Sequence, residues 1–114
     1  MKILAIDRVC EGATPERIKA QFLQEINRCV QLYLADVIRE MYFRQDRSGT
    51  VLVLEAPSLE EAQSFLARMP LVASGQVAFD CIPLGPYMPL GLLLTDVNAP
   101  DTSLLEDESG SAMQ

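Results

Sequence analysis

Along the first 84 residues, apolar positions either alternate with polar ones or recur every three to four residues. The segment "KILAIDRV" (Lys2 to Val9) is rich in β-forming residues and ends at "EGATP", which predicts a strand followed by a turn. In "ATPERIKAQFLQEINRCVQLYL", Thr14 suits a helix N-cap and Pro15 suits the first helical position. Apolar residues then recur at helical spacing and form one stripe: Ile18, Phe22, Ile26, Cys29, Val30 and Tyr33.

The next segments predict a hairpin, a second helix and a last strand. "VIREMYFRQ" (37–45) and "TVLVLEA" (50–56) read as strands joined by the turn "DRSG". In "PSLEEAQSFLARMP", Ser58 and Glu61 have the spacing of a capping box, and Pro70 is expected to end the helix. Its expected buried stripe consists of Leu59, Ala62, Phe65, Leu66 and Met69. With "QVAFDCIPL" as the fourth strand, the order β-α-β-β-α-β predicts an α+β, ferredoxin-like fold with a four-stranded antiparallel sheet.

Both faces of the central strands are apolar. Because β-α-β crossovers are right-handed, both helices are expected on one face of the sheet. The other face should then be polar, yet Val51 and Val53 alternate with the equally apolar Leu52 and Leu54. In the first strand, Ile3 and Ala5 alternate with Leu4 and Ile6 in the same way. A second copy of the chain is the simplest cover for this face, so at least a homodimer is expected.

Composition and charge exclude several classes of protein. The hydrophobic fraction of 49% and the charged fraction of 22% are typical of a soluble globular domain. No apolar run approaches the ~20 residues that span a bilayer, and the run before Asp7 is too short for a signal peptide, so a cytoplasmic protein is expected. The net charge is −7, but the last twenty residues hold five acidic residues and no basic one. The remainder is near neutral and offers no basic surface for nucleic acid.

Two segments follow the predicted sheet. The run "LGPYMPLGLLL" (84–94) is apolar and contains two prolines; we expect either a lid over a cavity or an arm that packs on a neighbouring subunit. Residues 95–114 lack periodicity and predict an acidic, flexible tail. The expected organisation is therefore a ferredoxin-like domain over 1–94, including the arm, and a tail over 95–114.

The stretch from Tyr42 to about Tyr87 resembles muconolactone isomerase and its uncharacterised relatives. The likeness consists of the hairpin, a short helix that ends in "ARMPLV", and the closing strand "VAFDCIPLGPY". These proteins belong to the dimeric α+β barrels, whose two sheets face each other around a cavity and whose dimers often form larger rings. The resemblance implies a dimeric α+β barrel, a homodimer or a ring of dimers, and a small-ligand cavity between sheets.

The residue types present narrow the chemistry. The chain has no histidine, which removes Ser-His and Cys-His nucleophiles and a proximal haem ligand, and makes zinc or non-haem iron sites improbable. The three cysteines have no C-x-x-C spacing, so reduced thiols are expected rather than a disulfide framework or a zinc cluster. No glycine-rich segment has the setting of a phosphate loop. We therefore expect no cofactor and no metal.

Polar residues on the strands remain as candidates for a site. If Met41 and Phe43 pack under the helices, strand alternation directs Glu40, Tyr42 and Arg44, with Ile38, toward the second face. By the same alternation, Asp80 and Arg8 point there too. Glu40 or Asp80 is the candidate catalytic base; the candidate substrate-binding residues are Arg8 and Arg44 for an anionic group, and Tyr42 for developing enolate charge. The competing interpretation is that these charges form edge-strand salt bridges or subunit contacts.

Two functions remain open from the sequence. The first is a cofactor-independent isomerase of a small lactone or enol acid, of the muconolactone isomerase type, that acts by proton transfer. The second is a non-catalytic module that binds a small organic acid or lactone, or only assembles. Clustering of the polar candidates in an enclosed pocket favours the enzyme, and exposed or mutually neutralised candidates favour the module.

Overall fold

The strands form one antiparallel sheet in the order β2-β3-β1-β4, and the predicted α+β, ferredoxin-like fold is confirmed. The computed structural model describes residues 1–94, so the predicted tail at 95–114 lies outside the described residues. The first of two compact units, Met1–Leu84, contains β1 (Lys2–Val9), α1 (Pro15–Leu34), β2 (Ile38–Phe43), β3 (Thr50–Glu55), α2 (Leu59–Ala67), α3 (Pro70–Ala73) and β4 (Val77–Leu84).

The two long helices begin where the sequence predicts. Thr14 caps α1, because its hydroxyl accepts the backbone N–H of Arg17 at 3.2 Å, and proline occupies the first turn. Ser58 caps α2 in the same way by accepting the N–H of Glu61 at 3.2 Å. Pro70, however, does not simply end the second helix. The helix ends at Ala67, and Pro70 begins the separate four-residue helix α3, since a proline needs no N–H partner in a first turn.

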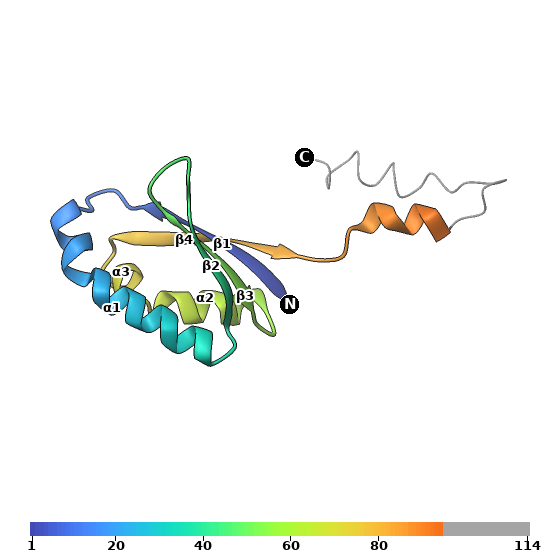
Figure 1. Ribbon diagram of the computed structural model, residues 1–114, viewed down its shortest axis with the longest axis horizontal. Coiled ribbons are helices and arrows are strands. Elements are labelled where there is room, and N and C mark those ends of the chain that lie inside the picture. Colours follow the sequence, from blue (N-terminus) through green and yellow to red (C-terminus); the bar gives the residue numbers. More distant parts are fainter. Residues whose placement is uncertain (95–114) are drawn as a thin grey trace. The chain divides into compact units, whose positions relative to one another are not determined.

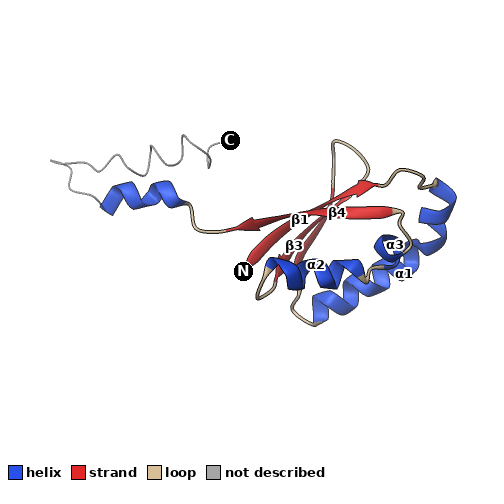
Figure 2. Cartoon of the chain, turned by 180° about the vertical axis from the view of Figure 1, so that it is seen from behind, coloured by secondary structure: helices blue, strands red, loops and turns tan. Residues whose placement is uncertain are grey.

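The helices cover one face of the sheet only. Figure 1 shows α1, α2 and α3 together on one side of the strands, and the reverse view in Figure 2 agrees. The core lies between these two layers. Its completely buried sheet residues come from β1, β2 and β3: Ile3, Ala5, Ile38, Leu52 and Leu54. From β4, Phe79 and Cys81 pack partly buried against this core.

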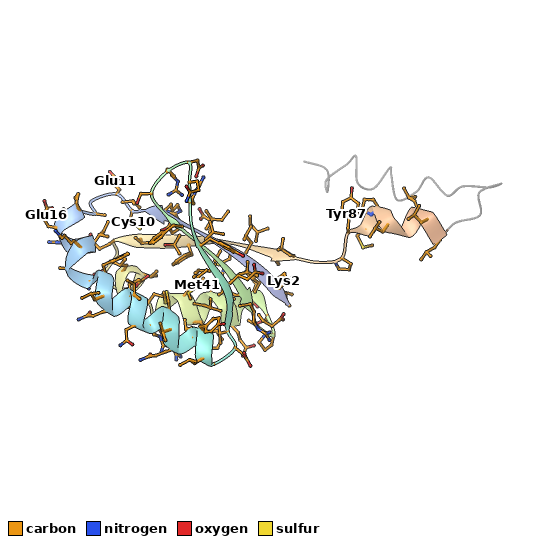
Figure 3. The ribbon with its side chains drawn as sticks, viewed as in Figure 1. Lys2, Cys10, Glu11, Glu16, Met41 and Tyr87 are labelled. Carbon is orange, nitrogen blue, oxygen red and sulfur yellow. The ribbon has the colours of Figure 1, made fainter. Side chains whose placement is uncertain are left out.

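A bulge in β2 changes the expected direction of Ile38. Ile38 pairs with Leu54, but Glu40 already pairs with Val53, so Arg39 has no directly opposed partner. The extra residue places Ile38 on the helix-covered face, where it is fully buried, and not on the second face with Glu40. The expected register holds beyond the bulge, because Met41 pairs with the buried Leu52; Figure 3 labels Met41 on this strand.

The second face of the sheet carries an apolar centre and charged margins. Cross-strand pairing puts Leu4 and Ile6 of β1 beside Val53 and Val51 of β3 on this face. The next strand, β4, adds Ala78 and Ile82. Ile82 is 45% exposed within the single chain, and the others are half-buried. The prediction of an apolar second face is therefore confirmed for the unit Met1–Leu84, and Leu52 and Leu54 are assigned to the helix side.

The apolar stripe predicted for α1 is only partly buried. Phe22, Ile26, Val30 and Tyr33 are between 37% and 51% exposed. The buried residues of this helix are Glu25 and Leu32. The helix is therefore turned so that Glu25, rather than the centre of the stripe, faces the neighbouring helix α3.

The second compact unit begins at Gly85 and includes a 3-10 helix, Met88–Leu94. The apolar arm expected at 84–94 thus contains regular structure after its prolines, while Leu84 itself is the last residue of β4. Leu93 and Leu94 are at least 80% exposed within the chain. None of the helices within residues 1–94 is long and apolar enough to cross a membrane.

The β2 bulge gives a prediction for stability. Replacing Ile38 with alanine should lower the free energy of unfolding by ~2–5 kcal/mol, because the fully buried side chain leaves a cavity in the core. Leu34→Ala is the matched control; Leu34 is 77% exposed at the end of α1, so the change should be small. Urea denaturation measures both. If both variants lost the same small amount of free energy of unfolding, Ile38 would not face the core.

Candidate functional site

Arg8 and Asp80 form an ion pair on the second face of the sheet. Nε of Arg8 lies 3.1 Å from Oδ1 of Asp80, and the two side chains are 58% and 62% exposed within the chain. They come from the neighbouring strands β1 and β4, as strand alternation predicts. An exposed pair of this kind contributes only ~0–1 kcal/mol to stability. Both groups are thus already partnered, which leaves neither of them free to bind a substrate without breaking the pair.

Glu40 and Tyr42 form a second pair at the opposite edge of the sheet. The Tyr42 hydroxyl donates a hydrogen bond to Oε1 of Glu40 at 2.5 Å. Acceptance of this bond by the carboxylate raises the pKa of Tyr42. Tyr42, Val51, Ile6 and Asp80 lie in one cross-strand row. Three strand spacings therefore separate Tyr42 from Asp80, about 14 Å across the sheet.

Arg44 lies apart from both pairs, in the turn after β2. Its guanidinium binds the Asp46 carboxylate with Nε at 2.8 Å from Oδ1 and lowers the pKa of Asp46 to about 2. Gly49 closes the turn, and a Cβ on it would come within 2.6 Å of the Asp7 carboxylate. The five residues predicted for the site thus divide into three separate groups within one chain.

A groove of about 310 Å³ lies on the other face of the sheet, under α1. Phe22 of α1 and Phe43 of β2 stack across its side with ring centroids 6.4 Å apart and planes 16° from parallel. Met41, Leu52 and Phe79 contribute further apolar side chains from three strands. The polar or titratable residues that line the groove are Glu25, Cys29, Tyr42 and Thr50; the Tyr42 hydroxyl is bonded to Glu40, whose side chain lies on the second face.

Glu25 is the unusual residue in this groove. The side chain is almost completely buried, and its Oε1 accepts the backbone N–H of Leu71 at 3.0 Å. Burial raises the pKa of the Glu25 carboxyl; the hydrogen bond from Leu71 opposes this effect, and the negative charge of Asp7 adds to it. A carboxyl group with a raised pKa beside an apolar groove is suited to proton transfer.

The sequence contains a signal for Glu25 that strand alternation does not reveal. Glu25 follows Phe22 by three residues and precedes Cys29 by four, so helical periodicity already places it on the apolar side of α1. Cys29 is poorly suited as a nucleophile, because burial raises the pKa of its thiol to about 11.

A second groove, of about 760 Å³, runs along the first half of α1 beside Val9. Its only polar lining side chains are Thr14 and Lys19, so it offers no carboxyl group for proton transfer. Within residues 1–94, no three His, Cys, Asp or Glu side chains gather closely enough to hold a metal ion.

Comparison with known proteins supports the fold. No family model matches the chain, and no curated protein matches it in sequence. Among solved structures, it is similar to the 5-chloro-2-hydroxyhydroquinone dehydrochlorinase TftG from Burkholderia phenoliruptrix AC1100, in complex with 2,5-dihydroxybenzoquinone. The TM-score is 0.60 at 18% identity, over 75% of this chain and 94% of that one. At this identity the likeness establishes the ferredoxin-like α+β fold alone.

Burial of Glu25 predicts a pH-dependent stability. The pKa of Glu25 in the folded chain is raised above the ordinary 4.5. Its protonated carboxyl therefore contributes fully to the free energy of unfolding below that pH, and this contribution is lost as pH rises through the folded-state pKa. Glu25→Gln has no such titration and can still accept the Leu71 N–H. Its free energy of unfolding, measured in urea, should therefore rise relative to wild type between pH 4 and pH 8. The exposed substitution Glu60→Gln serves as control, and an unchanged Glu25→Gln difference across this range would contradict the assignment.

Proposed function

We propose that this chain binds a small cyclic organic molecule in the groove under α1 and transfers a proton on it without a cofactor. The observation that supports this proposal is the nearly buried Glu25 carboxyl among aromatic and aliphatic side chains. Such a group can accept a proton from a carbon next to a carbonyl and return it to another carbon of the same molecule, which is an isomerisation. An isomerase of the muconolactone isomerase type fits this chemistry.

The structural neighbour is consistent with this substrate class. TftG is named as a dehydrochlorinase of a chlorinated hydroxyhydroquinone and was solved with a dihydroxybenzoquinone, so a small ring occupies a protein of this fold. For the present chain, a ring of similar size fits a groove of about 310 Å³.

A second location for the base remains within the same proposal. Glu40 or Asp80 would act on the second face, with Arg8, Arg44 and Tyr42 as the groups that hold the substrate. This site needs a partner subunit to exclude water, because all five side chains lie at the exposed margins or in the turn. It also needs the existing Arg8–Asp80 and Glu40–Tyr42 pairs to open. The geometry of one chain therefore favours Glu25.

We also propose that a second copy covers the second face of the sheet. An apolar centre surrounded by charged residues is the usual anatomy of a protein interface. Here the centre contains Leu4, Ile6 and Val53, and the margin includes Arg8 and Asp80. Two such faces related by a two-fold axis would bury each other's apolar centres and form a dimeric α+β barrel.

The alternative function is a non-catalytic module that binds a ligand or only assembles. The mutual neutralisation of Arg8 by Asp80, and the use of Tyr42 by Glu40, favour this alternative for the second face. It makes no use of the raised pKa of Glu25, and the enzyme proposal therefore accounts for more of the described residues.

Proton transfer can be measured directly. Small unsaturated lactones and cyclic hydroxyketones, incubated with the protein in D₂O, should exchange carbon-bound hydrogen for deuterium, followed by NMR. We expect the exchange to survive a chelator and to fall by ~10²–10⁴-fold in Glu25→Gln. The control variants Glu40→Gln and Asp80→Asn should keep it. If exchange were lost in Glu40→Gln or Asp80→Asn instead, the base would lie on the second face. Binding of these compounds without any exchange would support the non-catalytic module.

Association through the second face gives a separate prediction. Val53→Lys should convert a dimer to a 12.6 kDa monomer in sedimentation equilibrium at micromolar concentration, because a lysine would enter the apolar centre unpaired. Leu23→Lys is the matched control; Leu23 is 81% exposed on α1, away from this face. A wild-type protein that sediments only as a monomer would contradict the proposed dimer.

A further inference from the structure

The groove under α1 contains no basic side chain. Of its eleven lining residues, Glu25, Cys29 and Tyr42 are ionisable, and none of them can carry a positive charge. The Tyr42 hydroxyl is directed to Glu40. Glu25, which is turned toward α3, is a carboxyl group. The charged group that acts on it is the Asp7 carboxylate, which is also negative.

The two arginines of the hairpin turn, Arg44 and Arg47, are held by other acceptors. Arg47 donates from Nη2 to the backbone oxygen of Asp7 at 2.6 Å and from Nη1 to the backbone oxygen of Ser48 at 2.7 Å. Arg44 is bound to Asp46 through two of its nitrogens. Neither arginine lines the groove. The Asp7 carboxylate does not line the groove either and is paired with Arg47 at 3.5 Å. A ligand anion would therefore find no cation among the lining residues and would face the Glu25 carboxyl.

The remaining lining of the groove is mostly apolar. The rings of Phe22 and Phe43 are stacked almost parallel, and the two residues are 37% and 66% exposed. Aromatic rings of this kind favour a flat ligand ring in offset or edge-to-face contact. Thr50 supplies a hydroxyl, and Glu25 supplies the oxygen acceptors for a ligand O–H.

We infer that the groove takes an uncharged, flat ring that bears a hydroxyl or carbonyl group, and that it rejects the carboxylate of an organic acid. This inference rests on the proposed function, because it names the substrate class for the same groove. Placing an ionised carboxylate against apolar side chains without a counter-ion is strongly unfavourable, whereas a neutral hydroxyl can pair with Glu25. Arg8 and Arg44 then have no part in substrate recognition, contrary to the expectation of a small organic acid as ligand.

Two matched probes test the charge preference. At pH 7, 2-naphthol is neutral and 2-naphthoate is ionised, while their ring systems are the same. The chain has no tryptophan, so the fluorescence of either probe can be followed during titration with the full-length protein. We expect 2-naphthol to bind more tightly by more than about tenfold. Glu25→Gln should narrow this gap by strengthening the binding of 2-naphthoate, because it removes the negative charge.

Variants locate the binding and separate the outcomes. Phe43→Ala should weaken the binding of 2-naphthol. Leu34→Ala, at an exposed position that does not line the groove, should leave this binding unchanged. If 2-naphthoate binds as tightly as 2-naphthol, and Phe43→Ala weakens both, the substrate class is wrong while the proposed function stands. If neither probe shows binding that depends on Phe43, the proposed function of the groove fails, and the inference fails with it.

Discussion

The side chains of Ile3, Ile38, Leu52 and Leu54 hold the helices against one face of the sheet, and the other surfaces of the unit follow from this packing. The helices of the unit Met1–Leu84 cover only one face, so the opposite apolar strip is left without cover from its own unit. The helix side is also incompletely filled, since α1 leaves a groove along β2 and β3. One-sided packing thus accounts for both the proposed surface for association and the proposed recess for a ligand.

The position of α1 depends on a polar contact within this largely apolar layer. Glu25 would be unfavourable in the interior if its oxygens had no partner, and the N–H of Leu71 supplies one. With Glu25 directed to α3, the apolar residues Phe22, Ile26 and Val30 of the same helix remain partly exposed. An acid at the groove and aromatic side chains at its border therefore have a common structural cause.

The sequence predicts the fold better than the site, for physical reasons. Local signals such as the Thr14 and Ser58 caps and the period of two in β1 and β3 act over a few residues, and the structure confirms them. The bulge at Arg39 and the short helix after Pro70 result from tertiary packing, which local patterns do not contain. The direction of Glu25 depends in the same way on Leu71, which is 46 residues away. Strand alternation did place Glu40, Tyr42, Arg8 and Asp80 on one face, but the pattern could not show which of them pair.

The bond between Glu25 and the Leu71 amide connects the groove to the link between α2 and β4. The strength of this hydrogen bond changes with the charge on the Glu25 carboxyl, because an ionised oxygen accepts a shorter and stronger hydrogen bond than a neutral one. The amide proton of Leu71 is therefore a built-in spectroscopic reporter. Its chemical shift follows the ionisation of Glu25 from a buried position on another helix, where a molecule in the groove need not touch it.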